Sequence, residues 1–230
     1  MRSVAGATNR GEDSGAAAYV PAAAFKVLTP LYDPIVQVAS RERAFKEALL
    51  ERAGIEPGMR VLDVGCGTGT LAIWAKRECP DAVIDGLDGD PEILERARRK
   101  AAGAGVEIEL TEGFSTELPW PDASFDRVLS SLLFHHLVRA DKARTLTEIN
   151  RVLRPGGELH VADLGKPADP AMAVLSRGLA LLDGREQTAD NIAGNLPALV
   201  AAADFTGVSE GRSFRTAFGV LRTIEAIKPG

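Results

Sequence analysis

The sequence predicts an α/β protein with a mostly parallel sheet, helices on both faces and a helical N-terminal cap. Two observations lead to this prediction. From residue 59 onward, short aliphatic runs alternate with helical patterns, which is typical of a parallel sheet. A glycine-rich turn also joins the first of these strands to the first helix, and such a turn exposes backbone N–H groups at the positive end of the helix.

The 230 residues are enough for one sizeable domain. Residues 1–20 are rich in Gly, Ala and Ser and lack apolar periodicity, so we expect a mobile tail that cannot bury enough surface to become ordered. We find no linker further along the chain. The sequence therefore predicts a single domain over 21–230, consisting of a cap or lid (21–53) and a core (54–230).

The core contains seven strand patterns, at residues 59–64, 82–87, 106–110, 125–130, 158–162, 205–212 and 216–227. Helical patterns lie between them, at residues 70–77, from Asp90 onward, around an inner face of Leu146, Ile149 and Leu153, and at 190–203. Asp90, Pro91 and Glu92 follow the preferred order for a helix start. Pro155-Gly156-Gly157 is expected to end the preceding helix.

Composition and charge limit the classes of function. No run of eighteen apolar residues exists, and the first residues lack the apolar block of a secretory signal, so we expect a cytoplasmic protein that does not bind membranes. The two cysteines, Cys66 and Cys79, predict free thiols and no metal site. A net charge of −5 argues against a nucleic-acid partner.

The glycine turn has the spacing Gly65-x-Gly67-x-Gly69. A dinucleotide site would require Gly-x-Gly-x-x-Gly, and here Thr70 occupies the third glycine position. No Gly-Lys-Ser/Thr follows, which excludes a Walker loop. Asp63 ends the strand before the turn, and its carboxylate suits a cationic ligand better than a pyrophosphate.

A second acid lies about twenty residues further on, where a carboxylate can accept hydrogen bonds from both hydroxyls of a ribose. Asp88 and Asp90 are both candidates, and either could instead cap the next helix. Since Asp90 directly precedes Pro91, it fits the capping position, and we favour Asp88 as the ribose ligand.

Four segments together resemble the class I methyltransferases, in particular the bacterial branch of ubiquinone and menaquinone C-methyltransferases and natural-product methyltransferases. They are residues 61–69 (VLDVGCGTG), 119–126 (PWPDASFD), 133–137 (LFHHL) and 151–157 (RVLRPGG). The resemblance extends over about residues 25 to 227. It implies a Rossmann-like sheet of seven strands with one antiparallel strand, and S-adenosylmethionine as the cofactor.

The resemblance also assigns cofactor contacts. Backbone of the glycine loop would meet the methionine part, Asp63 and Ser130 would lie near its amino group, Asp88 would bind the ribose, and the turn after strand three would edge the adenine. The implied residues are Asp63, Gly65, Cys66, Gly67, Asp88, Gly89, Gly113, Phe114, Ser115 and Ser130.

Two positions depart from the pattern of these methyltransferases. Phe114 stands where an Asp is common, and Gly89 stands where an apolar residue usually forms one wall of the adenine site. Backbone N–H groups of the turn and stacking by the Phe114 ring would compensate for both changes.

On the acceptor side, His135 and His136 lie in the loop after strand four, where a histidine can remove a hydroxyl or amine proton at neutral pH. Alternatively, they cap a helix or bind a carbonyl. Asp163 follows strand five and would either orient such a histidine or act only as a turn residue. His160 is expected to pack within its strand.

The walls of the acceptor pocket are assigned by position. Phe25 and Tyr32 belong to the predicted lid and would line the pocket, or simply hold the cap on the core. Residues 181–195 would form the second wall, in which Arg185 either binds an acidic acceptor or remains solvated.

The sequence thus predicts methyl transfer from S-adenosylmethionine to a small organic acceptor (at O, N or C) by direct displacement, leaving S-adenosylhomocysteine. Two alternatives stay open: a family member that binds the cofactor without catalysis, and a nicotinamide-dependent oxidoreductase. The residues leave the acceptor unidentified and a homodimer open.

Overall fold

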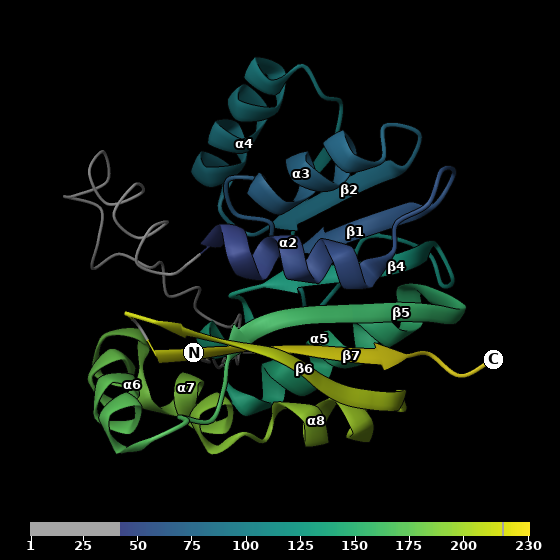
Figure 1. The fold of residues 1–230 in the computed structure, drawn as a ribbon. Helices are drawn as coiled ribbons and strands as arrows, with labels where there is room; N and C mark the ends of the chain where they lie inside the picture. Colours follow the sequence, from purple (N-terminus) through teal and green to yellow (C-terminus); the bar gives the residue numbers. More distant parts are fainter. Residues whose placement is uncertain (1–41, 218) are drawn as a thin grey trace, which may run out of the picture.

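The computed structural model describes residues 42–217 and 219–230, and these form one seven-stranded sheet (Figure 1). In spatial order the strands are β3-β2-β1-β4-β5-β7-β6. Their bounds are β1 Arg60–Val64, β2 Val83–Asp88, β3 Glu109–Glu112, β4 Phe125–Ser131, β5 Leu153–Leu164, β6 Thr206–Thr216 and β7 Gly219–Ile227.

The first five strands are parallel, and β7 runs antiparallel to both of its neighbours, β5 and β6. This confirms the predicted sheet. Strands β2 and β3 follow β1 on one side of it in the sheet, whereas β4 and β5 lie on its other side, so the strand order reverses at this point. In open α/β sheets, ligands bind beyond the carboxyl ends of the strands at such a reversal, which here lies between β1 and β4.

Helices cover both faces of the sheet, as predicted (Figure 1). Helices α2 and α3 pack on one face, with α4 beside α3, and α5 and α8 pack on the other. The bounds are α2 Glu42–Ala53, α3 Thr70–Glu78, α4 Pro91–Ala104, the 3-10 helix η2 Phe134–His136, α5 Arg139–Val152, α6 Pro170–Asp183, α7 Arg185–Ala193 and α8 Leu196–Ala202.

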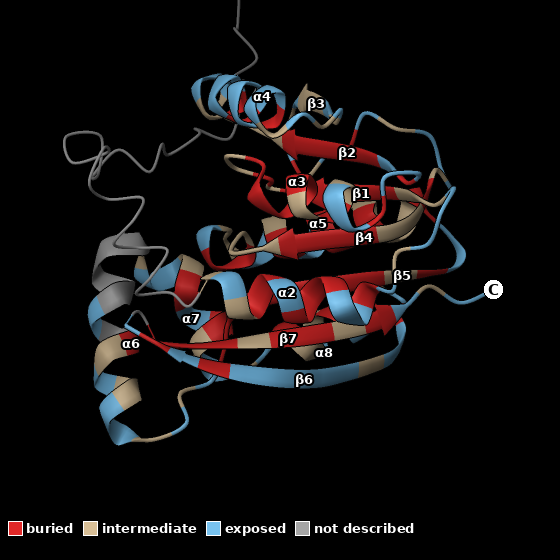
Figure 2. Cartoon of the chain, turned by 45° about the horizontal axis from the view of Figure 1, so that its top comes forward, coloured by how far each residue is buried: buried red, intermediate tan, exposed pale blue. Residues whose placement is uncertain are grey.

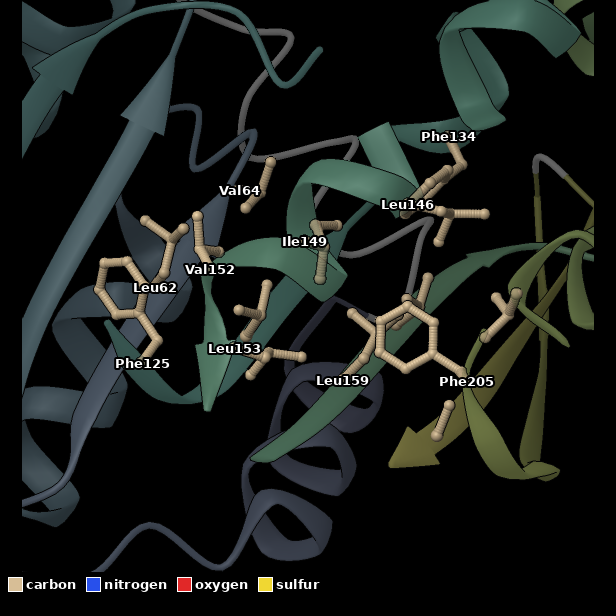
Figure 3. Close-up of a cluster of buried hydrophobic side chains, with 14 of the residues drawn as sticks. Leu62, Val64, Phe125, Phe134, Leu146, Ile149, Val152, Leu153, Leu159 and Phe205 are labelled. Atoms are coloured by element: carbon tan, nitrogen blue, oxygen red, sulfur yellow. The ribbon is translucent and has the colours of Figure 1, made fainter. Parts of the chain in front are cut away.

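Alternation along the strands divides the core into two clusters. In β1, Val61 faces α2 and α3, whereas Leu62 and Val64 face α5. Figure 3 shows the cluster on the α5 face of the sheet, which contains Leu62 and Val64 of β1 and Ile149 of α5. The central strands are buried on both faces (Figure 2), as expected for parallel strands between helix layers.

The start of α4 confirms the predicted helix cap. The side chain of Asp90 accepts hydrogen bonds from the backbone N–H groups of Glu92 and Ile93, at 2.9 and 3.3 Å, and Pro91 follows it. These bonds satisfy donors that the first turn would otherwise leave unpaired.

Several predicted boundaries were wrong. Strand β3 runs over Glu109–Glu112 instead of 106–110, and Ile108 just before it packs against the cluster that includes α2 and α3. Leu153 is buried as expected, but the helix already ends at Val152 and β5 begins at Leu153. Pro155-Gly156-Gly157 therefore lies within β5, contrary to the prediction that it ends the helix. The helix predicted at 190–203 is divided by Gly194, whose φ of 79° terminates α7.

Of the predicted cap, only α2 falls within the described residues. It packs on the sheet through Phe45, Ala48 and Leu49, all fully buried. Residues 1–41, which include the predicted tail, Phe25 and Tyr32, lie outside the described part of the chain. Among the described helices, none is long and apolar enough to cross a membrane.

Candidate active site

The glycine loop between β1 and α3 adopts a backbone that favours glycine at three positions. Gly65, Gly67 and Gly69 have φ values of 71°, 54° and 72°, in the left-handed region. The loop is fixed to the end of β2, because the N–H groups of Gly65 and Cys66 donate to the Leu87 carbonyl at 2.8 and 3.0 Å. The three glycines therefore shape a rigid turn at the carboxyl edge of the sheet.

The two sides of this loop differ. A Cβ on Gly67 would meet nothing within 4 Å, whereas a Cβ on Gly65 would lie 2.9 Å from Cδ1 of Leu133. The loop thus faces open space at Gly67 and contacts the segment after β4 at Gly65. Between them, Cys66 is buried, and burial raises the pKa of its thiol, so it remains a neutral thiol.

Asp63, the penultimate residue of β1, is a buried carboxyl whose two oxygens have no hydrogen-bond partner among the described residues. Burial raises its pKa to about 7, and the nearby positive charge of Lys46 on α2 acts in the opposite direction. A buried carboxyl without partners is expensive unless a ligand compensates it. Its position behind the glycine loop therefore fits a cationic ligand such as the ammonium group of S-adenosylmethionine.

Asp88 ends β2 and faces the same loop. Its Oδ2 accepts from the N–H of Gly67 at 2.9 Å, and its Oδ1 accepts from the N–H of Asp90 at 3.0 Å. Partial burial raises its pKa. A carboxylate has about four acceptor positions, so Asp88 retains the capacity to accept from a ribose. The capping work falls to Asp90, as the sequence suggested.

The predicted adenine edge follows β3. The N–H of Gly113 donates to the Asp88 carbonyl at 3.1 Å, which holds this turn beside the end of β2. The Phe114 side chain is 58% exposed, and a Cβ on Gly89 would lie 3.3 Å from its ring. Ser115 is buried, and its hydroxyl is bonded to that of Thr145 at 2.9 Å. Gly89 and Phe114 thus sit together, and Phe114 exposes a ring at the expected adenine position.

Two residues near the end of β4 organise the next segment. Ser130 is fully buried, and its hydroxyl donates to the Val64 carbonyl at 3.1 Å, which ties β4 to β1. Leu132 has a φ of 59°, rare for a residue with a side chain, and its N–H donates to the Ala162 carbonyl at 2.9 Å. This strained turn directs the chain from β4 into η2, beside the glycine loop.

His135 and Asp163 meet at this edge of the sheet. His135 Nδ1 lies 2.8 Å from Asp163 Oδ1, and both side chains are buried. The carboxylate also accepts from the N–H of Phe134 (2.7 Å, to Oδ2) and from that of Leu164 (2.7 Å, to Oδ1). Burial alone would raise the pKa of Asp163, but the charge and hydrogen bonds of His135 and its other donors lower it overall.

The geometry of this pair defines a chemical capacity. An ionised carboxylate only accepts hydrogen bonds, so it favours a hydrogen on Nδ1 of His135 and a lone pair on Nε2. Within the described residues, Nε2 has no hydrogen-bond partner. The Asp–His contact that the sequence suggested is therefore present, and its catalytic role stays a prediction.

The other predicted acceptor-side residues lie around this pair. The ring of His136 lies against that of His135, with centroids 4.0 Å apart and planes tilted by 43°, and His136 is exposed. Its pKa is lowered, because the surrounding protein desolvates the ring and a charge on His135 would repel it. Arg185 is exposed at the first position of α7, and His160 is buried within β5, as expected.

Sequence reasoning missed Asn191 and Lys142. Asn191 on α7 is fully buried and donates through Nδ2 to Asp163 Oδ1 at 3.1 Å. Lys142 on α5 is also fully buried, and its ammonium group donates to the Gln187 carbonyl at 2.6 Å. Both contacts join segments distant in the chain, so no local pattern could have revealed them.

Comparisons with known proteins identify the family of this chain. The family described as "Methyltransferase domain" matches residues 61–157. The demethylmenaquinone methyltransferase of Deinococcus radiodurans is 37% identical over 155 residues, which cover 66% of this chain and 64% of that protein. The enzyme of the same name from Thermus thermophilus is 34% identical over 155 residues, covering 66% of this chain and 70% of that protein.

Among solved structures, the YcgJ protein of Bacillus subtilis superposes with a TM-score of 0.67 at 20% identity, covering 80% of this chain and 98% of that one, a likeness of fold. Fold and site together define a Rossmann-like α/β protein with a ligand cradle at its strand reversal. The chain belongs to the class I methyltransferases, which use S-adenosylmethionine as the methyl donor. It spans 64% of the length of its Deinococcus relative.

Proposed function

We propose that this chain methylates a small organic acceptor by direct displacement, with His135 as the base wherever the acceptor must lose a proton. The observation that carries this proposal is the His135–Asp163 pair, 2.8 Å apart, two residues beyond the leucine that contacts Gly65. This arrangement would put the imidazole of His135 beside the loop that we propose holds the donor.

When bound, S-adenosylmethionine supplies an electrophilic methyl group on a sulfonium ion. Asp63 and Asp88 would hold it through its ammonium group and its ribose, and the Phe114 ring would cover the adenine. These roles are supported by the buried unpartnered carboxyl, by the carboxylate at the loop and by the exposed ring. The acids also give the cradle a negative potential, which favours a cationic ligand.

On the acceptor side, the residues of this chain would position the acceptor and remove its proton. Nε2 of His135 would take the proton of an O–H or N–H group while that atom bonds to the methyl carbon and the carbon–sulfur electron pair returns to sulfur. Asp163 would stabilise the resulting imidazolium. Orientation of the two reactants supplies much of the rate, so an acceptor without such a proton needs only the positioning.

The names of the relatives support a planar ring compound as the first acceptor class to try, since two of them are demethylmenaquinone methyltransferases. The net charge of −5 supports a small molecule over a nucleic acid. A homodimer stays a prediction that sedimentation would decide.

The test is transfer of a labelled methyl group across a panel of quinols, phenols, amines and carboxylic acids. We expect His135→Ala and Asp163→Asn to slow methylation of the hydroxyl acceptors by roughly 10²–10⁴-fold, as for loss of a general base. Affinity for S-adenosylhomocysteine, measured by calorimetry, should stay unchanged in both variants. Full turnover in both would overturn the base.

The same panel, together with thermal stabilisation by cofactors, distinguishes the two alternatives from methyl transfer. A member that binds without catalysis would bind S-adenosylhomocysteine and label no acceptor, even at high enzyme concentration. An oxidoreductase would be stabilised against heat by a nicotinamide cofactor and not by S-adenosylhomocysteine.

A further inference from the structure

Helix α7 packs against η2, β5 and α5 through polar side chains. Its buried residues are Thr188, Asp190 and Asn191, and two of the three are completely buried. Burial of polar groups costs free energy unless each one forms hydrogen bonds, and apolar residues would hold a helix in place more simply. A polar contact surface does, however, fix the orientation of the groups that it binds.

Asn191 binds the strand that carries the candidate carboxylate. Its Nδ2 donates to Asp163 Oδ1 at 3.1 Å and to the Leu164 carbonyl at 3.3 Å. Both partners are acceptors, which defines the orientation of the amide. The amide thus bridges the carboxylate and the backbone of the next residue, and it holds the carboxylate together with the N–H groups of Phe134 and Leu164.

The neighbouring residue fixes the helix itself. Asp190 accepts from Arg139 at 2.5 Å, and its other oxygen lies 3.9 Å from the ammonium group of Lys142. Lys142 also donates to the Gln187 carbonyl at 2.6 Å, and burial lowers its pKa. Because α7 is held to α5 one residue before Asn191, the amide has a defined place from which to hold Asp163.

We propose that Asn191 is a positioning residue for the His135–Asp163 pair. It holds the Asp163 carboxylate so that the hydrogen of His135 stays on Nδ1 and the lone pair stays on Nε2. Which ring nitrogen carries the hydrogen is set by the partner of the other nitrogen, so a carboxylate free to turn would allow the opposite tautomer. The effect of this role on catalysis rests on the proposed function, whereas the predicted tautomer of His135 does not depend on it.

The tautomer can be read without an acceptor. The chain has three histidines, so long-range ¹H–¹⁵N spectra of protein labelled with ¹⁵N-histidine show three rings, which His136→Asn and His160→Asn assign. At neutral pH we expect a single Nδ1–H tautomer for His135. Asn191→Leu should replace it with a mixture that contains the Nε2–H form. Thr188→Val, an equally buried change on the same helix, should leave the His135 signals unchanged.

An unchanged His135 tautomer in folded Asn191→Leu would overturn the proposal, as would an Nε2–H form in the unaltered protein. If Asn191→Leu does not fold, Asn191→Ser is measured instead; its hydroxyl is too short to span both acceptors, and the same mixture is expected. Once an acceptor is found, Asn191→Leu should lower kcat about tenfold and leave KM for S-adenosylmethionine unchanged. Failure to find any acceptor would count against the proposed function alone.

Discussion

The Asp88 carboxylate accepts a hydrogen bond of 2.9 Å from the backbone N–H of Gly67, so the candidate ribose ligand also holds the glycine loop. We expect Asp88→Ala to weaken binding of S-adenosylhomocysteine by about 1–3 kcal/mol, because it loses charged hydrogen bonds to the ligand and to the loop. Calorimetry measures this loss directly.

The neighbouring acid provides the control. Asp90 caps α4, so Asp90→Ala should lower the free energy of unfolding by about 1 kcal/mol and leave the affinity nearly unchanged. Equal losses of affinity in the two variants would contradict the division of roles between them.

Gly65 and Gly67 should respond differently to alanine. Both have a positive φ, so each substitution strains the backbone by roughly 1–2 kcal/mol. A Cβ on Gly65 would also collide with Leu133, whereas one on Gly67 would enter open space. We expect Gly65→Ala to lower the melting temperature more, and Gly67→Ala to lower cofactor affinity more relative to its stability loss. The reverse order in denaturation and calorimetry would argue against the cradle.

Asp63 should make the ligand-free protein less stable as the pH rises. The pKa of Asp63 is about 7 in the folded protein and 3.8 in the unfolded chain. Its contribution to the free energy of unfolding is therefore full below pH 3.8 and is lost as the pH rises through 7. Asp63→Asn should therefore stabilise the ligand-free protein at pH 8 by up to about 4 kcal/mol, at about 1.4 kcal/mol per pKa unit, with little effect near pH 4. Urea denaturation at the two pH values measures the difference.

The same carboxyl should make cofactor binding depend on pH in the opposite sense. An ammonium group binds the ionised form of Asp63, so affinity for S-adenosylhomocysteine should rise between pH 6 and 7.5 in the unaltered protein. Asp63→Asn should bind more weakly and lose this rise. A rise of the same size in the variant would assign it to another group.

Arg151 fixes the segment that follows the predicted adenine edge. Its guanidinium donates to the carbonyls of Leu118 and Trp120 at 2.9 and 2.8 Å, and to the carboxylates of Asp122 and Glu148 at 2.9 and 2.7 Å. Lysine cannot reproduce this planar set of donors. We expect Arg151→Lys to destabilise the protein by about 1–3 kcal/mol.

Arg151→Lys should also weaken cofactor binding, because the turn at Phe114 loses its support. The control is Arg99→Lys, since Arg99 is an exposed residue of α4 that pairs only at 3.5 Å with Glu95. Unchanged stability in Arg151→Lys, measured by thermal denaturation, would show that the hydrogen bonds of the Arg151 guanidinium are dispensable.

Local patterns were sufficient for the elements around the glycine loop. The glycine spacing, the acid before it and the Asp90 cap all depend on residues close in sequence, and the sheet with one antiparallel strand followed from the resemblance. Helix α6 was not predicted, although Asp169 and Pro170 repeat the start signal of α4, with the Asp169 side chain accepting from the N–H of Met172. That signal could have been found.

The acceptor side depends on contacts across the fold. The sequence placed Asp163 near a histidine because adjacent parallel strands end at the same edge. The sequence predicted a helix at 190–203 and a pocket wall at 181–195, but it could not indicate that Asn191 would contact this carboxylate, since Asn191 lies 28 residues beyond Asp163. Only the packing of α7 on α5 brings the amide to this position.

Because Leu132 has a left-handed conformation, substitutions at this position can change the turn between β4 and η2. A glycine there would relieve roughly 1 kcal/mol of steric strain, but it would also loosen the turn that leads from β4 into η2. Heat tolerance and catalytic alignment thus compete at a single side chain. Directed evolution toward bulkier acceptors could begin at this position, where a change in backbone preference would move η2 without altering any residue proposed to bind the donor.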